Sequence, residues 1–297
     1  MSSLPQSDAV ASIKVRELLV EALPKLLVEN PSKLAEANAE IDKFKTKTGL
    51  DSRAFEQMAL GMQYRYPRPG ITKIDTIALA RGTFKTATIV AAGHAAAPGK
   101  YREEKYRNST IYIFTLDQQI KIAGLPTLQM HELAVTVWEP DLLALGSLQV
   151  VRAMIDQGKA QAAANAELIA LATQDPKALI GFAGRVTPAL LSNLKLDNEG
   201  IAKDLSTIRL VHGRAGLTAK DFELLLAART TDAASAKSLA ETIESLKQLG
   251  SLFVGRLPPP RAGVARTALE NLSITTEGNE LRVRTAVEQS QVGILIR

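Results

Sequence analysis

Residues 76–147 contain four short apolar runs: TIALA at 76–80, TIYIFT at 110–115, LAVTVW at 133–138 and LLAL at 142–145. Each run is rich in β-branched, aromatic or aliphatic residues and is bounded by residues that favour turns. This pattern is typical of strands buried on at least one face. We therefore expect a sheet in this stretch, with the remaining chain forming helices and hairpins on that sheet or on a second copy of it.

Two hairpins are expected within the same stretch. The first joins residues 101–106 to 110–115, and the second joins 133–138 to 142–145 through a turn that contains a proline. Hairpins give antiparallel pairing because a short turn returns the chain beside itself.

The chain before this stretch begins with a strand at 8–15 and a helix at 16–29. Pro24 should break that helix, because proline lacks a backbone N–H and crowds the preceding turn. A second helix is expected from Pro31 to Gly49, with proline at its start and glycine at its end. The other expected elements are strands at 58–66 and 222–229, helices at 85–97, 148–157, 160–173, 200–211, 233–249 and 261–272, and a third hairpin at 272–287.

The organisation of the chain restarts near Pro176. The strand and helix expected at 177–183 (KALIGFA) and 186–194 (VTPALLSNL) repeat the order of the first two elements and share a Val-x-x-x-Leu spacing with VRELLVEAL at 15–23. A Gly-Leu pair also precedes a Phe-Glu pair by the same interval in 49–56 and in 216–223. Two repeated sequence patterns that occur in the same order predict an internal duplication.

The mixture of hairpins and helices, without regular strand–helix alternation, predicts an α+β fold. We expect two related halves, residues 1–158 and 159–297, each a mostly antiparallel sheet with helices packed on one face. The two halves can pack as one continuous unit.

Composition narrows the classes of function. Hydrophobic residues make up 46% of the chain, enough for a core, whereas aromatic residues at 4% provide no evident platform for stacking bases or sugars. The net charge of +5 comes from 36 basic and 31 acidic residues spread through the same segments. A nucleic-acid-binding face should concentrate its positive charge, so no nucleic-acid partner is expected.

The chain has no cysteine, which excludes disulfides, thiolate metal sites and thiol nucleophiles. No apolar run approaches the ~20 residues that span a bilayer, so no transmembrane segment is expected. The first residues, MSSLPQSD, lack the charged and apolar regions of a signal peptide.

The chain was compared with phosphate-binding, zinc-protease and serine-hydrolase motifs, and it lacks a required residue or spacing of each. GHAAAPGK at 93–100 has five residues between its glycines, and Tyr101 stands where a phosphate-binding loop needs Ser or Thr. His131 and Glu132 begin a zinc-protease motif, but position 135 is valine. His94, His131 and His212 fall in different predicted elements, and no G-x-S-x-G elbow occurs. The sequence thus indicates no catalytic residue, cofactor or metal ligand, although the members of a Ser–His–Asp triad need not be near each other in sequence.

The segment KYREEKYR at 100–107 concentrates charge beside two tyrosines. On a strand, alternate residues share a face, so the segment offers an edge for recognising a partner or an anion. Its weak candidates for partner binding are Tyr101, Arg102, Lys105 and Arg107. We favour the purely structural alternative, in which the segment is a solvated strand and its mixed charges discourage edge-to-edge pairing.

Five passages resemble a family of uncharacterised exported bacterial proteins. They are SDAVASIKVRELL at 7–19, FKTKTGLDSRAFEQMALG at 44–61, KYREEKYRNSTIYIFTLD at 100–117, DLLALGSLQVVRAMID at 141–156 and ENLSITTEGNELRV at 270–283. The resemblance implies an α+β protein of the periplasm or envelope that is normally made with a leader. It implies no functional residues.

We therefore expect a non-catalytic exported protein that binds another protein or an envelope component through its sheet edges or the cleft between its halves. The alternative is a hydrolase with a carboxylate- or serine-based site that the sequence does not reveal. A third reading is association with an anionic membrane surface through the basic balance of charge.

Overall fold

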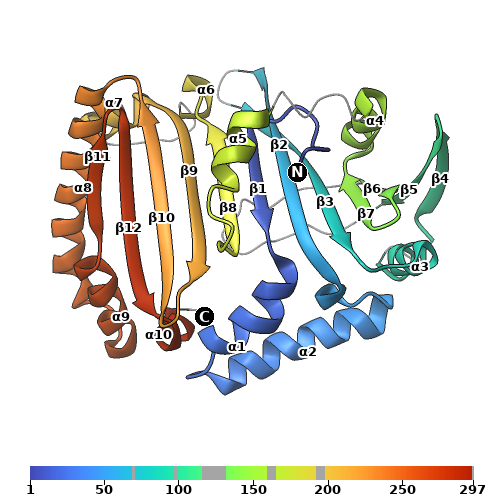
Figure 1. Ribbon diagram of the computed structural model, residues 1–297, viewed down its shortest axis with the longest axis horizontal. Coiled ribbons are helices and arrows are strands. Elements are labelled where there is room, and N and C mark those ends of the chain that lie inside the picture. The colour runs from blue at the N-terminus through green and yellow to red at the C-terminus, as the bar shows by residue number, and fades with distance from the viewer. Residues whose placement is uncertain (69–70, 97–98, 116–131, 159–164, 192–197, 296–297) are drawn as a thin grey trace.

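The four apolar runs form neighbouring strands, as the sequence predicts. They are β3 (Ile71–Gly82), β7 (Leu142–Gly146), β6 (Glu132–Glu139) and β5 (Ser109–Thr115), and β4 (Tyr101–Tyr106) completes that end of the sheet. Both hairpins predicted within this stretch, β4–β5 and β6–β7, are confirmed, and so is the third predicted hairpin, which joins Ser273–Glu277 to Glu280–Glu288. The computed structural model describes residues 1–68, 71–96, 99–115, 132–158, 165–191 and 198–295 (Figure 1).

In the other direction the sheet continues from β3 without interruption. The strands that follow, in spatial order, are β2 (Phe55–Arg68), β1 (Ala9–Ile13), β8 (Ile180–Arg185), β9 (Ile208–Leu217), β10 (Asp221–Thr230), β12 (Glu280–Glu288) and β11 (Ser273–Glu277). Every pairing in this twelve-stranded sheet is antiparallel, and helices accompany it, so the α+β fold is confirmed.

The two predicted halves meet at the centre of the sheet. β1 pairs with β8 along its whole length, from Ala9 opposite Gly184 to Ile13 opposite Ile180. On either side of this pair the strands follow in chain order, β1–β2–β3 and β8–β9–β10. One of the two repeated sequence patterns, the Gly-Leu pair followed by the Phe-Glu pair, does not fit this order. Phe55 begins β2, the second strand of the first half, whereas Phe222 lies in β10, the third strand of the second half. The duplication of the halves stays a prediction.

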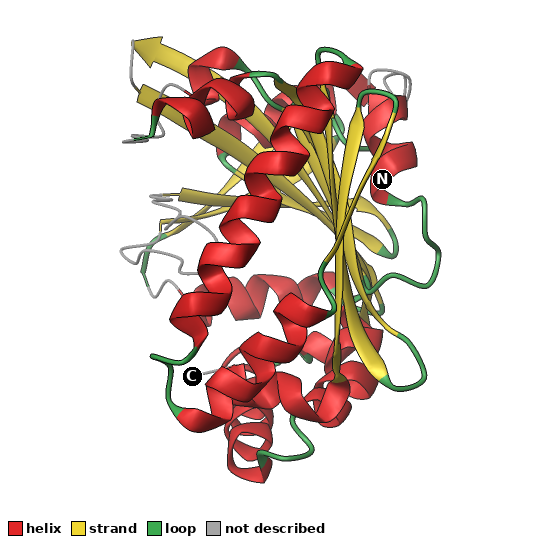
Figure 2. Cartoon of the chain, turned by 90° about the vertical axis from the view of Figure 1, so that its left-hand side faces the viewer, coloured by secondary structure: helices red, strands yellow, loops and turns green. Residues whose placement is uncertain are grey.

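Helices lie along both faces of the sheet, not on one face as expected, and the long helix α8 crosses one of the faces diagonally (Figure 2). The first half contributes η1 (Glu17–Ala22, a π-helix), α1 (Leu23–Leu26), α2 (Pro31–Thr48), the 3₁₀ turn η2 (Ser52–Ala54), α3 (Thr86–Ala96) and α4 (Leu148–Gln157). The second half contributes α5 (Ala166–Ala172), α6 (Pro188–Leu191), α7 (Glu199–Ser206), α8 (Ala233–Val254), α9 (Pro259–Glu270) and α10 (Gln289–Leu295). No helix in these described segments is both long and apolar enough to cross a membrane.

Alternation along β5 shows how the two faces are covered. Ile111 and Ile113 pack against Val151 and Ile155 of α4 on one face. Phe114, the next residue along, packs against Ile89 of α3 on the other face. Successive side chains of a strand point to opposite faces, so one strand serves two cores. We call these the α4 face and the α3 face.

Proline and glycine set the ends of α2, as predicted, but proline does not break the helix before it. The helix expected at 16–29 is not broken at Pro24: the π-helical residues up to Ala22 pass directly into α1 at Leu23, and the backbone of both residues is helical. α2 begins at Pro31, and Gly49 ends it with a φ of 74°, a left-handed conformation that glycine adopts without strain.

The helix predicted at 200–211 is wrong in its second half. α7 ends at Ser206, and β9 begins at Ile208. Ile208, Leu210 and His212 are buried, a period of two that marks a strand, and their pairing with β8 and β10 outweighs the helical pattern that precedes them. The helices expected at 160–173 and 186–194 are present in part, as α5 and α6, and residues 159–164 and 192–197 lie outside the described residues.

Two glycines give a matched test of how the helices pack on this sheet. A Cβ atom at Gly181 of β8 would lie 1.9 Å from the carbonyl oxygen of Ala172 in α5, whereas one at Gly263 of α9 would meet nothing within 4 Å. We expect Gly181→Ala to lower the free energy of unfolding by about 2 to 3 kcal/mol, because α5 must move. Gly263→Ala should raise it by about 0.5 to 1 kcal/mol, because alanine favours a helix. Urea unfolding of both variants measures this. Equal effects would contradict the close approach of α5 to β8.

Candidate functional site

The four candidate residues of the charged segment lie on the edge strand β4 and its turn, and each contacts another part of the chain. Arg102 bonds to Glu132 at 3.1 Å, Lys105 donates to Thr110 at 2.8 Å, and Arg107 pairs with Asp156 at 2.6 Å. Tyr101 donates its hydroxyl hydrogen to Glu103, and burial together with this bond raises the pKa of the phenol.

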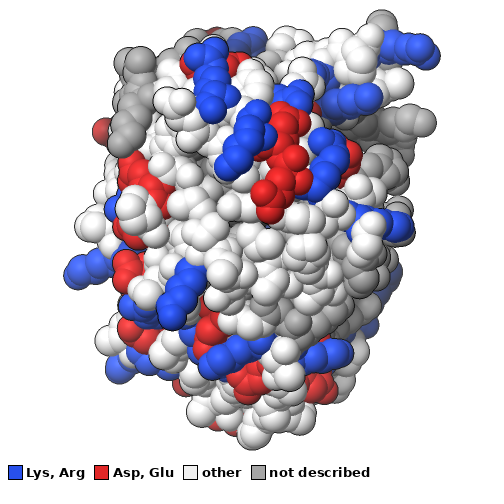
Figure 3. Space-filling view, turned by 90° about the vertical axis from the view of Figure 1, so that its right-hand side faces the viewer, with Lys and Arg blue, Asp and Glu red and all other residues white. Residues whose placement is uncertain are grey.

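Basic and acidic side chains alternate on this side of the molecule, without a continuous stripe of one sign (Figure 3). Neutralisation within the chain leaves little attraction for a charged partner, because opposite charges a few ångströms apart cancel at a distance. A role for Tyr101, Arg102, Lys105 and Arg107 in partner binding stays a prediction.

The rejected phosphate-loop motif has a packing role where the structure describes it. A Cβ atom at Gly93 would lie 1.9 Å from the ring of Phe114, so only glycine lets α3 approach β5 this closely. The ring of His94 lies 4.1 Å from that of Tyr101. His131 lies outside the described residues, and the described part of the chain contains no cluster of three metal-binding side chains.

His212 belongs to a buried charged cluster on the second half of the sheet. Its Nε2 lies 3.3 Å from Oε2 of Glu280, which also accepts from Nε of Arg229 at 2.9 Å. The other oxygen of Glu280 accepts from Nε of Arg282 at 2.8 Å. His212 and Glu280 are 4% and 8% exposed. Burial alone would raise the pKa of Glu280, but hydrogen bonds from Arg229, Arg282 and His212 outweigh it and lower this pKa to about 2.

This cluster is built for stability more than for proton transfer. A carboxylate with a pKa of about 2 is a poor base near neutral pH, since a general base works best with a pKa near the working pH. Its arginines are paired further, Arg229 with Glu167 at 3.0 Å and Arg282 with Glu277 at 3.0 Å. The cluster ties β9, β10 and β12 together across the α4 face.

A different feature offers a binding site. On the α3 face, a cavity of about 240 Å³ lies between α2, α3 and the strands β2, β3, β5, β6 and β7. The described residues that line it are all apolar: Phe44, Leu50, Phe55, Met58, Ala80, Ile89, Ala92, Gly93, Phe114, Leu133, Val135, Leu143 and Leu145. We call it the apolar pocket.

The apolar pocket arises from small residues placed opposite large ones. Ala80 pairs with Met58 on one side and Leu143 on the other, and Ala92 and Gly93 of α3 lie above them. Gly49 turns the chain at the end of α2 and brings Leu50 to the wall. Phe44 of α2 is 44% exposed and marks the rim.

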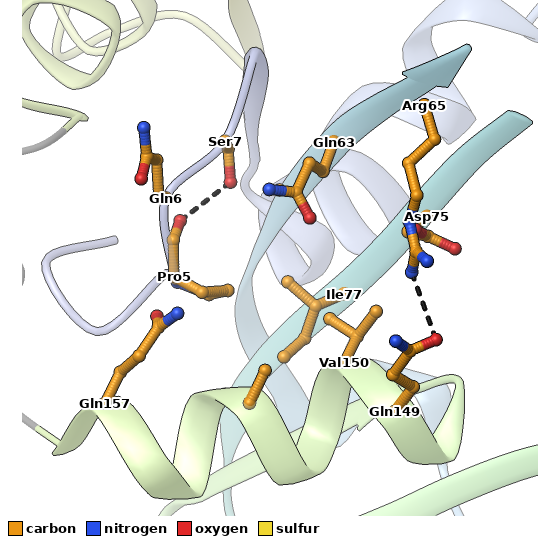
Figure 4. A pocket seen from close by; sticks show the side chains of 12 residues that line it. Pro5, Gln6, Ser7, Gln63, Arg65, Asp75, Ile77, Gln149, Val150 and Gln157 are labelled. Atoms are coloured by element: carbon orange, nitrogen blue, oxygen red, sulfur yellow. Dashed lines mark hydrogen bonds and ion pairs between the residues drawn. The ribbon is translucent and has the colours of Figure 1, made fainter. Parts of the chain in front are cut away.

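A second, polar pocket of about 150 Å³ lies on the α4 face (Figure 4). Its floor is Gly61 and Ile77, and its walls come from the segment 5–7, β2, β3 and α4. Its polar lining consists of Gln6, Ser7, Gln63, Arg65, Asp75, Gln149 and Gln157. Asn165 holds the segment 5–7 in place, because it accepts from the Ser7 N–H at 2.9 Å and donates to the Pro5 carbonyl at 2.7 Å.

Ser7 is not activated as a nucleophile in the polar pocket. Its hydroxyl donates to the Pro5 carbonyl at 2.8 Å, and the described lining of the pocket includes no histidine. An activated serine needs a base at hydrogen-bond distance.

Sequence reasoning missed both pockets. Neither pocket has a motif, because its residues come from segments far apart in the chain. A usable signal was the group of small residues Ala80, Ala92 and Gly93 inside otherwise bulky elements, since missing volume in a core leaves a cavity unless neighbours collapse.

The fold has a counterpart among solved structures. No protein-family model matches the chain, and no curated protein matches it. Crystal form III of TP0453 aligns with 99% of this chain and 96% of that chain, at 10% sequence identity and a TM-score of 0.50. Crystal form IV of the same protein aligns with 99% and 95%, at 10% identity and a TM-score of 0.49. The first likeness supports the fold over the whole chain and carries no function.

The buried cluster predicts how stability depends on pH. The pKa of Glu280 is lowered from 4.5 to about 2 by folding, so its contribution is complete above pH 4.5 and is lost as the pH falls towards 2. We expect this loss to reach about 3 kcal/mol. Glu280→Gln should be less stable than the native protein at pH 7 and should show a flatter pH dependence between 4.5 and 2. Urea unfolding followed by circular dichroism measures both.

Glu277→Gln is the matched control, because Glu277 is exposed and pairs with the same arginine. It should change stability by less than about 1 kcal/mol. An unchanged pH slope in Glu280→Gln would show that other carboxylates control acid unfolding.

Proposed function

We propose that this protein is a non-catalytic, exported binding protein that holds one fatty acyl chain, a constituent of envelope lipids, in the apolar pocket. The observation that carries the proposal is a cavity of about 240 Å³ whose lining residues are all apolar. An apolar cavity of roughly 150 Å³ is already enough to bind a benzene-sized molecule. The volume here therefore suits a longer hydrocarbon segment.

The energetic cost of an empty pocket supports an occupant. The apolar pocket opens to solvent at its rim, where Phe44 is 44% exposed, so the unoccupied pocket leaves apolar side chains in contact with water. Removing that apolar surface from water is favourable. A bound acyl chain would cover these apolar side chains and provide the van der Waals contacts that the unoccupied pocket lacks.

The chemistry of the lining favours binding over catalysis. None of the described side chains that line the apolar pocket ionises or carries a hydroxyl group. Recognition of an acyl chain would depend on its shape and on the hydrophobic effect, which is proportional to the apolar area removed from water. The resemblance of five sequence passages to exported bacterial proteins supports placing this function at the cell envelope.

A substitution that fills the pocket tests the proposal. Ala92 lines the pocket from α3, whereas Ala91, the preceding residue of the same helix, is exposed. In titrations with the fluorescent fatty acid cis-parinaric acid, we expect the native protein to bind saturably, with palmitate competing. Ala92→Phe should weaken binding at least about tenfold, because the ring occupies the space of the chain.

Ala91→Phe controls for the added ring and should bind as the native protein does. Thermal unfolding without ligand separates loss of the site from loss of the fold, since a ring that fills an empty cavity should not lower the melting temperature. The absence of saturable binding to the native protein, or equal binding by Ala92→Phe, would refute the proposal.

A further inference from the structure

The polar pocket on the α4 face contains an unsatisfied buried acceptor. Oε1 of Gln157 is shut off from solvent and has no hydrogen-bond partner among the residues that the structure describes. Buried polar atoms in native proteins almost always have partners, and each exception calls for an explanation. Gln157 lines the pocket at the C-terminal end of α4 (Figure 4). A ligand in the pocket can supply the missing donor once the carboxamide turns its oxygen toward the cavity.

The charges around the pocket favour a neutral ligand. Arg65 forms an ion pair with Asp75 and donates to Oε1 of Gln149 at 3.3 Å. The two charges of the lining therefore neutralise one another, and Oδ2 of Asp75 is a second buried acceptor that has no hydrogen bond within the described part of the chain. An ionic ligand would have to separate this pair, which costs energy in a partly buried site.

The remaining polar groups fit hydroxyl groups. Gln6, Gln63, Gln149 and Gln157 carry carboxamides, each of which has two donors and an acceptor. A hydroxyl group also donates and accepts, so several hydroxyl groups on one small molecule match several carboxamides. Ile77, Val150 and Ala153 provide apolar surface for carbon-bound hydrogens.

The size of the pocket limits the ligand to one small ring. About 150 Å³ equals the liquid volume of roughly five water molecules. We propose that the polar pocket is a binding site for a small neutral polyol, such as a single monosaccharide or a cyclitol, with Gln157 accepting one of its hydroxyl hydrogens. This site is separate from the apolar pocket, which lies on the opposite face of the sheet.

The experiment is a ¹H–¹⁵N NMR titration of the full chain with D-glucose and with myo-inositol. Glycine and glutamate serve as charged comparators. We expect saturable shifts with a Kd on the order of 1 mM for one polyol, the affinity of a ligand of about twelve non-hydrogen atoms at modest efficiency. Binding of cis-parinaric acid should be unaffected, so failure of this proposal is distinguishable from failure of the acyl-chain proposal.

Three variants locate the site. Gln157→Met keeps the length of the side chain but removes the acceptor, and should weaken polyol binding at least about tenfold. Ala153→Leu fills the pocket from α4 and should abolish binding, which provides a second test if Gln157→Met disturbs the fold. Gln174→Met, at an exposed glutamine outside the pocket, should bind as the native protein does.

Several outcomes would overturn the proposal. They are no saturable shift with either polyol, undiminished binding in Gln157→Met or Ala153→Leu, and tighter binding of glycine or glutamate than of the polyols. The first would mean that the pocket holds water only.

Discussion

The pairing of β1 with β8 is the contact on which the architecture depends. These two strands, 9–13 and 180–185, are separated by more than half of the chain, yet their backbones form the seam of one continuous sheet. Without this seam each half would present a sheet edge with unpaired N–H and C=O groups, which promotes aggregation. The seam satisfies both edges at once. It also places Val10 and Ala183 in the core that α4 and α5 cover.

Alternation along the strands then assigns each residue to one of two faces. Met58 pairs with Ala80 and faces the apolar pocket, whereas Gly61 pairs with Ile77 and faces the polar pocket. Strands β2 and β3 therefore form the common wall of both pockets. The two-residue period of a strand allows one pair of strands to present an apolar site on one side and a polar site on the other without conflict.

Much of the fold could be predicted from local patterns, and the rest depends on distant contacts. TIYIFT and LAVTVW signal strands because their bulky side chains suit a pleated, buried surface, and Gly49 and Pro31 signal helix ends through their backbone chemistry. The sequence analysis did not predict β9, because Ile208 and Leu210 directly follow a helix. Over a few residues they fit the period of a helix as well as the period of a strand. Its strand identity comes from β8 and β10 beside it. Likewise, Ala80 and Ala92 are ordinary residues for a strand and a helix, and only their meeting in space creates a cavity.

The buried polar groups of this molecule divide into two kinds, and the division explains where binding is expected. Glu280 is surrounded by donors, so its lone pairs are used and its charge is held by Arg229, Arg282 and His212. Gln157 is buried at its oxygen and accepts from no donor in the described segments. Both groups lost hydrogen bonds to water on folding, but only Glu280 gained hydrogen bonds from other side chains in their place. A satisfied cluster stabilises the sheet, whereas an unsatisfied acceptor beside a cavity lowers the free energy of any complex that supplies the donor. The same reasoning applies to the apolar pocket, where the missing partners are carbon atoms.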